Sequence, residues 1–166
     1  MQFDGEKIMI GGIAAAEIAE RYGTPTYVYD EQKIRANYRR AYQAFAKHYP
    51  DFQFFYAVKC CNNPAIVNIL RQEGAGADCA SVNEILLAKS VGLSGEQVMF
   101  SGNFLSDADI QQGLESGVIF NLDDISILPR LLKFGTPEMI SFRVNRTASR
   151  ISHLLLSSFH SHSYGS

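Results

Sequence analysis

The chain of 166 residues lacks tryptophan and has only three cysteines, Cys60, Cys61 and Cys79. Their odd number argues against a disulfide framework, and because no Cys-x-x-Cys spacing occurs, a zinc site is not expected either. Only His48 lies before residue 146, so a histidine base for nucleophilic catalysis is hard to supply. We therefore expect no metal site and a protein kept in a reducing compartment.

Long apolar runs and basic clusters are also missing. No run approaches the roughly 18 apolar residues of a membrane-spanning helix. The largest basic cluster is Arg39-Arg40 and the formal net charge is -2, which argues against binding to nucleic acid. Residues 1–6 carry acidic groups where a secretory signal needs positive charge. We expect a cytoplasmic protein without membrane or nucleic-acid partners, which acts on a small molecule or associates with another protein.

What the chain does have is a repeat. From Phe52 onward a short apolar run is followed by a capped amphipathic segment and then a glycine. The apolar runs are centred near residues 55, 78, 99, 120 and 141, so successive spacings are 23, 21, 21 and 21 residues. Such spacing predicts βα units and a parallel α/β sheet. The pattern permits an open doubly wound sheet, complete with five strands, or part of an eight-stranded barrel.

The segments between the runs carry helix-start signals. These are Asn63-Pro64, the pair Ser81 and Glu84, Ser106, and Asp123-Asp124, the last expected to cap a helix that extends to Phe134. Before the repeat we expect a short strand at 8–10, a helix at 14–22, a strand at 26–29 and a helix that begins after Asp30. Residues 146–166 contain seven serines, three histidines and no acidic residue, and we expect a disordered tail.

Lys59 follows the apolar run Phe54 to Val58 and is the most unusual candidate residue. Desolvation at the mouth of a sheet favours the free amine, which can form a Schiff base with a carbonyl compound. The alternative is that its flexible side chain simply extends to water. Cys60 and Cys61 are alternative nucleophiles, or small apolar packing residues.

Two further charged residues end neighbouring runs. Asp78 can pair with Lys59 or cap the following turn, and Arg143 can bind an anionic or ring-nitrogen group or form a surface ion pair. Because loops after the carboxyl ends of parallel strands build the site in both candidate folds, these residues are expected at one edge of the sheet.

Several segments, in order along the chain, resemble one family of enzymes. They are Tyr22 to Asp30, Phe55 to Lys59, Gly76 to Ser81 with Glu84, Phe100 to Asn103, and Ser141 to Asn145. Together they resemble the alanine-racemase-like, fold-type III pyridoxal-phosphate enzymes. Within that family they are most similar to the diaminopimelate decarboxylases, although Lys59-Cys60 and Asp78 to Ser81 also resemble ornithine decarboxylases.

The resemblance implies an α/β fold that is part of a (β/α)8 TIM-type barrel, about four and a half βα units long. Residues 1–30 would belong with a β domain, 31–145 would form the partial barrel, and 146–166 match nothing in the family. The implied cofactor is pyridoxal 5'-phosphate, held covalently by Lys59, with Asp78 and Arg143 beside it and Asn103 in a nearby loop. The implied partners are an amino-acid substrate and, for the full-length family, a second subunit in a homodimer.

The sequence also departs from the family pattern. Cys60-Cys61 replace the usual Ala-Asn, and Ser101 stands where a histidine is common. The ring-stacking histidine, the glycine-rich phosphate loop, the Glu-Pro-Gly-Arg segment and the partner-subunit cysteine would all lie beyond Asn145, where residues 146–166 contain none of these motifs.

Our leading hypothesis is therefore decarboxylation of meso-diaminopimelate to L-lysine, in lysine biosynthesis, with this chain inactive alone. The alternatives are an ornithine, lysine or arginine decarboxylase of the same family, and a non-catalytic interaction or regulatory protein.

Overall fold

The computed structural model describes residues 2–5 and 7–144, so the predicted tail at 146–166 lies outside the described residues. Contacts divide the chain into two units, with the division between Phe52 and Gln53. Each unit is described by itself. The predicted boundary after residue 30 stays a prediction about which segments belong with a β domain.

The first unit begins with a small antiparallel sheet in the order β1 (Gln2–Asp4), β2 (Lys7–Ile10) and β3 (Ile13–Ala14). Gly11 and Gly12 link β2 to β3 with φ values of 58° and 84°, and a two-residue hairpin turn of this kind needs positive φ at both positions. Helix α1 (Ala15–Tyr22) follows. The predicted strand at 26–29 is wrong: this extended segment pairs with no strand in the described chain, and without ladder hydrogen bonds alternation alone makes no strand.

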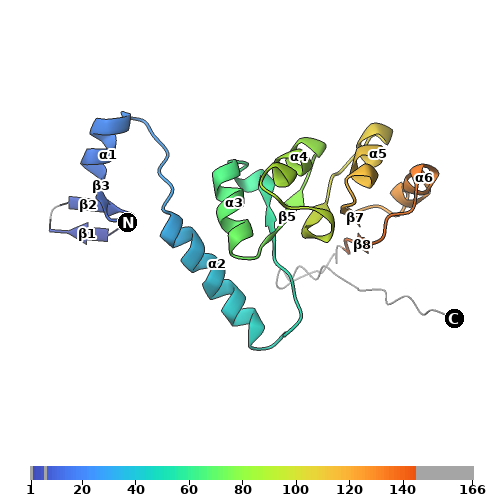
Figure 1. Ribbon diagram of the computed structural model, residues 1–166, viewed down its shortest axis with the longest axis horizontal. Coiled ribbons are helices and arrows are strands. Elements are labelled where there is room, and N and C mark those ends of the chain that lie inside the picture. Colours follow the sequence, from blue (N-terminus) through green and yellow to red (C-terminus); the bar gives the residue numbers. More distant parts are fainter. Residues whose placement is uncertain (1, 6, 145–166) are drawn as a thin grey trace, which may run out of the picture. The chain divides into compact units, whose positions relative to one another are not determined.

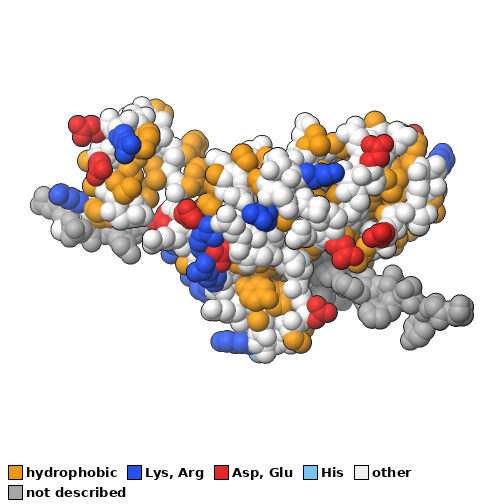
Figure 2. Space-filling model, viewed as in Figure 1, with side chains coloured by type: hydrophobic (Ala, Val, Ile, Leu, Met, Phe, Trp, Pro, Cys, Tyr) orange, Lys and Arg blue, Asp and Glu red, His pale blue; other side chains and the backbone are white. Residues whose placement is uncertain are grey.

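Helix α2 (Glu31–Ala46) starts where the sequence predicts, because Asp30 Oδ1 accepts a hydrogen bond from the Lys33 amide at 3.0 Å. Aromatic side chains of this helix pack against Phe52, which lies in the same unit. The ring centroids of Tyr42 and Phe45 are 4.8 and 5.8 Å from the ring centroid of Phe52. Figure 2 shows lysine and arginine side chains gathered along α2, as expected of a helix face in water.

The second unit contains five parallel strands in the order β4 (Phe55–Ala57), β5 (Gly76–Cys79), β6 (Val98–Phe100), β7 (Ile119–Leu122) and β8 (Ile140–Phe142) (Figure 1). The predicted parallel sheet is thus confirmed. Spatial order equals chain order, so the sheet has no point at which the strand order reverses. A doubly wound sheet has such a point and a barrel does not, which favours the barrel.

Four helices alternate with the strands: α3 (Pro64–Gln72), α4 (Val82–Ser90), α5 (Asp107–Glu115) and α6 (Ile127–Phe134). Two short 3-10 turns, η1 (Val58–Cys60) and η2 (Gly95–Gln97), complete the unit. Asn63 and Ser106 cap α3 and α5 as predicted. The predicted cap of α6 is wrong, because Asp124 Oδ1 accepts from the Ser126 amide at 2.8 Å and stabilises a turn that precedes the helix.

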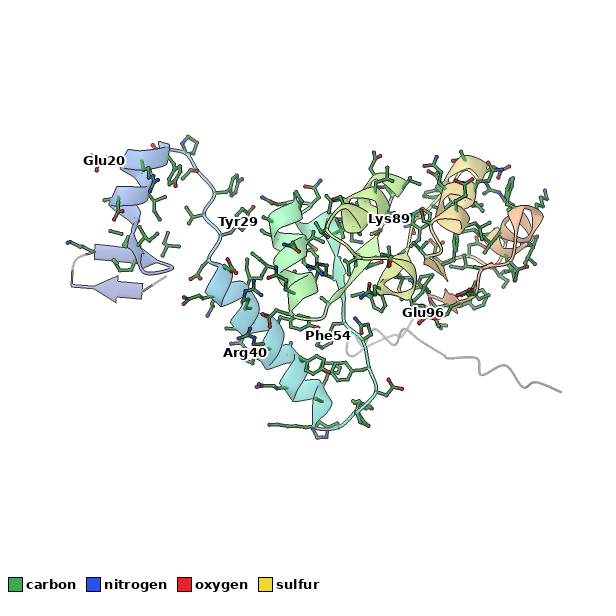
Figure 3. All side chains as sticks on the ribbon, in the orientation of Figure 1. Glu20, Tyr29, Arg40, Phe54, Lys89 and Glu96 are labelled. Atoms are coloured by element: carbon green, nitrogen blue, oxygen red, sulfur yellow. The ribbon has the colours of Figure 1, made fainter. Side chains whose placement is uncertain are left out.

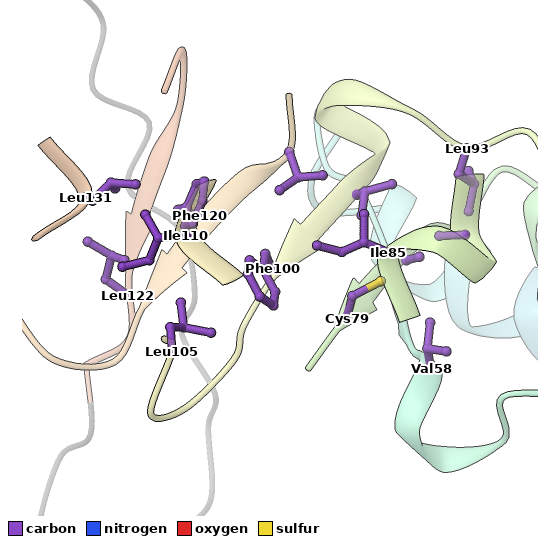
Figure 4. Packing of buried hydrophobic residues seen from close by; sticks show 14 of the residues in the cluster. Val58, Cys79, Ile85, Leu93, Phe100, Leu105, Ile110, Phe120, Leu122 and Leu131 are labelled. Atoms are coloured by element: carbon purple, nitrogen blue, oxygen red, sulfur yellow. The ribbon is translucent and has the colours of Figure 1, made fainter. Parts of the chain in front are cut away.

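The core lies between the sheet and these helices (Figure 4). Cys79, Phe100 and Phe120 come from successive strands, and Ile85 and Ile110 come from the helices that cover them. Phe100 and Phe120 pack with ring centroids 5.7 Å apart. Because side chains alternate along a strand, residues next to these point to the opposite face of the sheet. Within the described chain, no helix is both long and apolar enough to cross a bilayer.

Candidate functional site

Lys59 is the middle residue of η1, directly after β4. The strand therefore ends at Ala57, one residue before the end of the apolar run. Val58 is wholly buried, whereas the Lys59 side chain is exposed. The turn thus separates a buried anchor from an exposed amine at the carboxyl edge of the sheet.

Asp78 is the third residue of β5 and pairs in register with Ala57 of β4 and Met99 of β6. Its neighbours Ala77 and Cys79 are buried against the helices, so Asp78 belongs to the other face. Its Oδ1 atom is buried and has no hydrogen-bond partner among the described residues. A buried carboxylate oxygen without a donor is costly, so this atom is suited to a donor that a ligand or a moving side chain brings.

The turn after β5 is capped without Asp78. Glu84 accepts a hydrogen bond from the Ala80 amide at 2.7 Å, and Ser81 Oγ accepts one from the Glu84 amide at 3.3 Å. The predicted pairing of Ser81 with Glu84 at a helix start is present, although the glutamate reaches Ala80 and not Ser81. The sequence allows two structural roles for Asp78, pairing with Lys59 and capping the following turn. Other residues cap this turn. The described part of the chain shows no ion pair between Asp78 and Lys59.

The loop after β6 holds Asn103, another predicted site residue. It is exposed, and so is Phe104, whose side chain is 100% accessible and whose φ is 57°. Leu105, by contrast, is buried, and its carbonyl oxygen accepts a hydrogen bond from Arg130 at 2.9 Å. The loop is thus fixed at its second half and presents Asn103 and Phe104 to solvent.

A ladder of polar side chains crosses three strands on the face that also carries Asp78. Ser141 Oγ donates to Asn121 Oδ1 at 2.8 Å, and Asn121 Nδ2 donates to Ser101 Oγ at 3.0 Å. This ladder was not predicted from the sequence. A signal was present, because the three residues are spaced by 20, close to the repeat.

Arg143 directly follows β8. Its amide donates to the Leu122 carbonyl at 2.8 Å, which extends the pairing with β7 by one residue, and its side chain is exposed. Lys59, Asp78, Ser101 and Arg143 therefore lie at the carboxyl ends of four strands of one sheet.

The three cysteines differ in accessibility. Cys60 is exposed and Cys61 is half-buried, whereas Cys79 is buried in the core. Burial, with smaller effects from Glu84 and Asp78, raises the pKa of the Cys79 thiol to about 12. Cys79 is therefore a packing residue, since the thiolate is the nucleophilic form. No cluster of three histidine, cysteine or acidic side chains suited to a metal occurs in the described residues.

At the carboxyl edge, Lys59, Asn103 and Arg143 are exposed. A hollow of about 420 Å³ lies in the first unit, and another of about 390 Å³ lies near the amino-terminal ends of β7 and β8. Neither is lined by a predicted site residue. The edge thus combines a primary amine, a carboxylate and hydroxyl groups on an accessible face, a combination suited to holding a carbonyl compound through Lys59.

Comparison with known proteins identifies the family. Residues 34–166 match the family model described as pyridoxal-dependent decarboxylase, pyridoxal binding domain, and this range includes the segment 146–166, which we expected to match nothing in the family. This chain belongs to the pyridoxal-dependent decarboxylases. The predictions of the family and of a pyridoxal cofactor are thereby confirmed.

Among relatives of known sequence, a diaminopimelate decarboxylase of Methanothermobacter thermautotrophicus is 45% identical over 143 residues, which cover 86% of this chain and 33% of that protein. One from Thermoplasma acidophilum is 33% identical, over 86% of this chain and 35% of the relative. This decarboxylase chain therefore spans about a third of the length of the curated relatives it matches.

A solved structure gives the same result for the fold. The diaminopimelate decarboxylase of Methanocaldococcus jannaschii, solved in complex with L-lysine, has a TM-score of 0.77 and 31% identity over 86% of this chain and 35% of that one. The predicted fold, an α/β chain that forms part of a TIM-type barrel, is confirmed.

Proposed function

We propose that this chain is the lysine-bearing part of a diaminopimelate decarboxylase, which converts meso-diaminopimelate to L-lysine in the cytoplasm as a homodimer. The substrate assignment is supported by the 45% identity to a relative named diaminopimelate decarboxylase. The L-lysine complex of the M. jannaschii structure agrees with this assignment. Ornithine, lysine and arginine are the alternative substrates within the family.

The residues at the sheet edge fit pyridoxal phosphate. Lys59 offers an exposed amine for its aldehyde, and the buried Oδ1 of Asp78, which has no donor in the described chain, can accept from a protonated nitrogen at that position. When bound, the cofactor supplies an electron sink for the electron pair left as carbon dioxide departs.

The other predicted residues have supporting roles in this proposal. Arg143 brings a guanidinium to the same edge, where it would bind an anionic or ring-nitrogen group. Asn103 would contact the cofactor or substrate from the loop after β6. Since the chain spans about a third of its relatives' length, we propose that it does not turn over substrate alone.

A second candidate function is a non-catalytic one, in which the partial barrel binds another protein. The observation that favours it is the sheet topology: within the described residues, β4 and β8 each pair on one side only. Such free edges template association with another strand. Sedimentation would distinguish the two, because a monomer that captures the cofactor and ignores a full-length homologue would contradict the interaction function.

The decisive test is covalent capture of the cofactor. The full chain is incubated with pyridoxal phosphate, reduced with borohydride and mapped by mass spectrometry. We expect the adduct on Lys59 and its loss in Lys59→Ala. Lys89→Ala is the matched control, because Lys89 is an exposed lysine in the last turn of α4 (Figure 3). Equal labelling of Lys59 and Lys89 would contradict the proposal.

A further inference from the structure

The direction of the polar ladder leaves one hydrogen-bond donor unused. Ser141, which is 9% exposed, donates to Asn121, and Asn121 donates to Ser101. Ser101 Oγ is therefore an acceptor within the ladder, and its own hydrogen meets no acceptor in residues 2–5 and 7–144. A serine hydroxyl can accept and donate at the same time, so Ser101 remains able to donate to a ligand.

The position of Ser101 matches a ligand attached to Lys59. The Ser101 amide donates to the Cys79 carbonyl at 2.8 Å, so Ser101 is one strand away from Asp78 and two strands away from the strand before Lys59. At the usual strand spacing this separation is about 10 Å. An aromatic ring linked to the flexible Lys59 side chain spans such a distance across Asp78.

The charged groups near Ser101 determine which atom of a ligand can accept its hydrogen bond. Glu84 is hydrogen-bonded to the Ala80 amide at the end of the adjacent strand, and Asp78 lies on the same face as Ser101. These two carboxylates disfavour a phosphate dianion at this point, whereas a ring hydroxyl or ring carbonyl oxygen needs a single donor.

We propose that Ser101 is a cofactor-binding residue that donates its hydroxyl hydrogen to the ring oxygen adjacent to the aldehyde of the pyridoxal compound held by Lys59. The proposal rests on the proposed function.

The test is the pyridoxal phosphate concentration that half-saturates borohydride-trapped adduct on Lys59 in the full chain. We expect Ser101→Ala to raise this concentration about fivefold, the value of one ordinary hydrogen bond. Ser101→Thr keeps the hydroxyl and should restore wild-type capture. Ser141→Ala is the matched control, since it shortens the same ladder at its far end and should change capture less than about twofold.

Equal effects of Ser101→Ala and Ser141→Ala, or a failure of Ser101→Thr to restore capture, would overturn the role of Ser101 while leaving the proposed function intact. No adduct on Lys59 in the wild-type chain would overturn both. Pyridoxal without its phosphate should show the same fivefold ratio, and loss of the ratio would exclude the ring oxygen as the acceptor.

Discussion

Arg130 of α6 binds the Asp107 carboxylate at the start of α5, with its Nη2 and Nε atoms 2.6 and 3.1 Å from Asp107 Oδ1. The same guanidinium donates to the Leu105 carbonyl. One side chain therefore joins two successive βα units and fixes the loop after β6.

Removal of this guanidinium should destabilise the second unit. We expect Arg130→Met to lower the free energy of unfolding by about 1 to 2 kcal/mol, because it loses a partly exposed ion pair and leaves the Leu105 carbonyl without its donor. Urea unfolding measures the change. Lys133→Met, on the same helix, should cost no more than a few tenths of a kcal/mol, and a similar cost for both variants would contradict the expected role of Arg130.

A side chain at Gly76 should destabilise the second unit. A Cβ atom there would lie 2.7 Å from the Gln97 carbonyl oxygen and 2.7 Å from the Phe55 ring. The carbonyl belongs to the backbone and cannot rotate away, so we expect Gly76→Ala to cost about 1 to 3 kcal/mol in thermal or urea unfolding. An unchanged midpoint would show that β5 and the Gln97 backbone can separate at no cost.

The cap of α5 should make stability depend on pH. Ser106 donates hydrogen bonds to Asp109 and lowers the pKa of that carboxyl below its ordinary value. A lowered native pKa stabilises the fold above the unfolded pKa, and this contribution disappears as the pH falls through the native pKa. Urea unfolding at neutral pH and well below pH 3.8 should show the loss, and Asp109→Asn should reduce it. Ser106→Ala should cost about 1 kcal/mol at neutral pH.

The cysteines should react with a thiol reagent in a fixed order. Cys60 is exposed, whereas the buried Cys79 thiol has its pKa raised to about 12. We expect iodoacetamide to modify Cys60 in the native chain and Cys79 only after urea unfolding, because the alkylating agent requires an accessible thiolate. Peptide mapping by mass spectrometry measures both sites. Native modification of Cys79 at the rate of Cys60 would mean that β5 opens readily.

The strands and most helix starts could be predicted because the signals are local. The apolar run Phe54 to Val58 identifies β4, and Asn63-Pro64 identifies the start of α3. Neither signal requires knowledge of the rest of the chain. The prediction failed where the outcome depends on a distant partner. Residues 26–29 alternate like a strand but pair with no strand in the described chain. The Asp124 prediction failed for a local reason, because its carboxylate accepts from the Ser126 amide two residues away instead of capping α6.

The site was predictable in part for the same reason. The position of Lys59 after an apolar strand marked it as a candidate, and the resemblance supplied its chemistry. The orphaned oxygen of Asp78 and the ladder through Ser101 and Ser141 depend on strand register, which pairs residues 20 or more positions apart. Register follows from packing across the sheet, and no short motif encodes it.

Because every strand of the second unit lies beside its nearest neighbour in sequence, residues paired in register are only 20 or 21 positions apart. Closing such short loops costs little chain entropy, and contacts of low sequence separation form quickly. During synthesis each βα unit can pack against the unit that was completed just before it. A segment one third the length of its relatives thus contains every pairing partner that β5, β6 and β7 use.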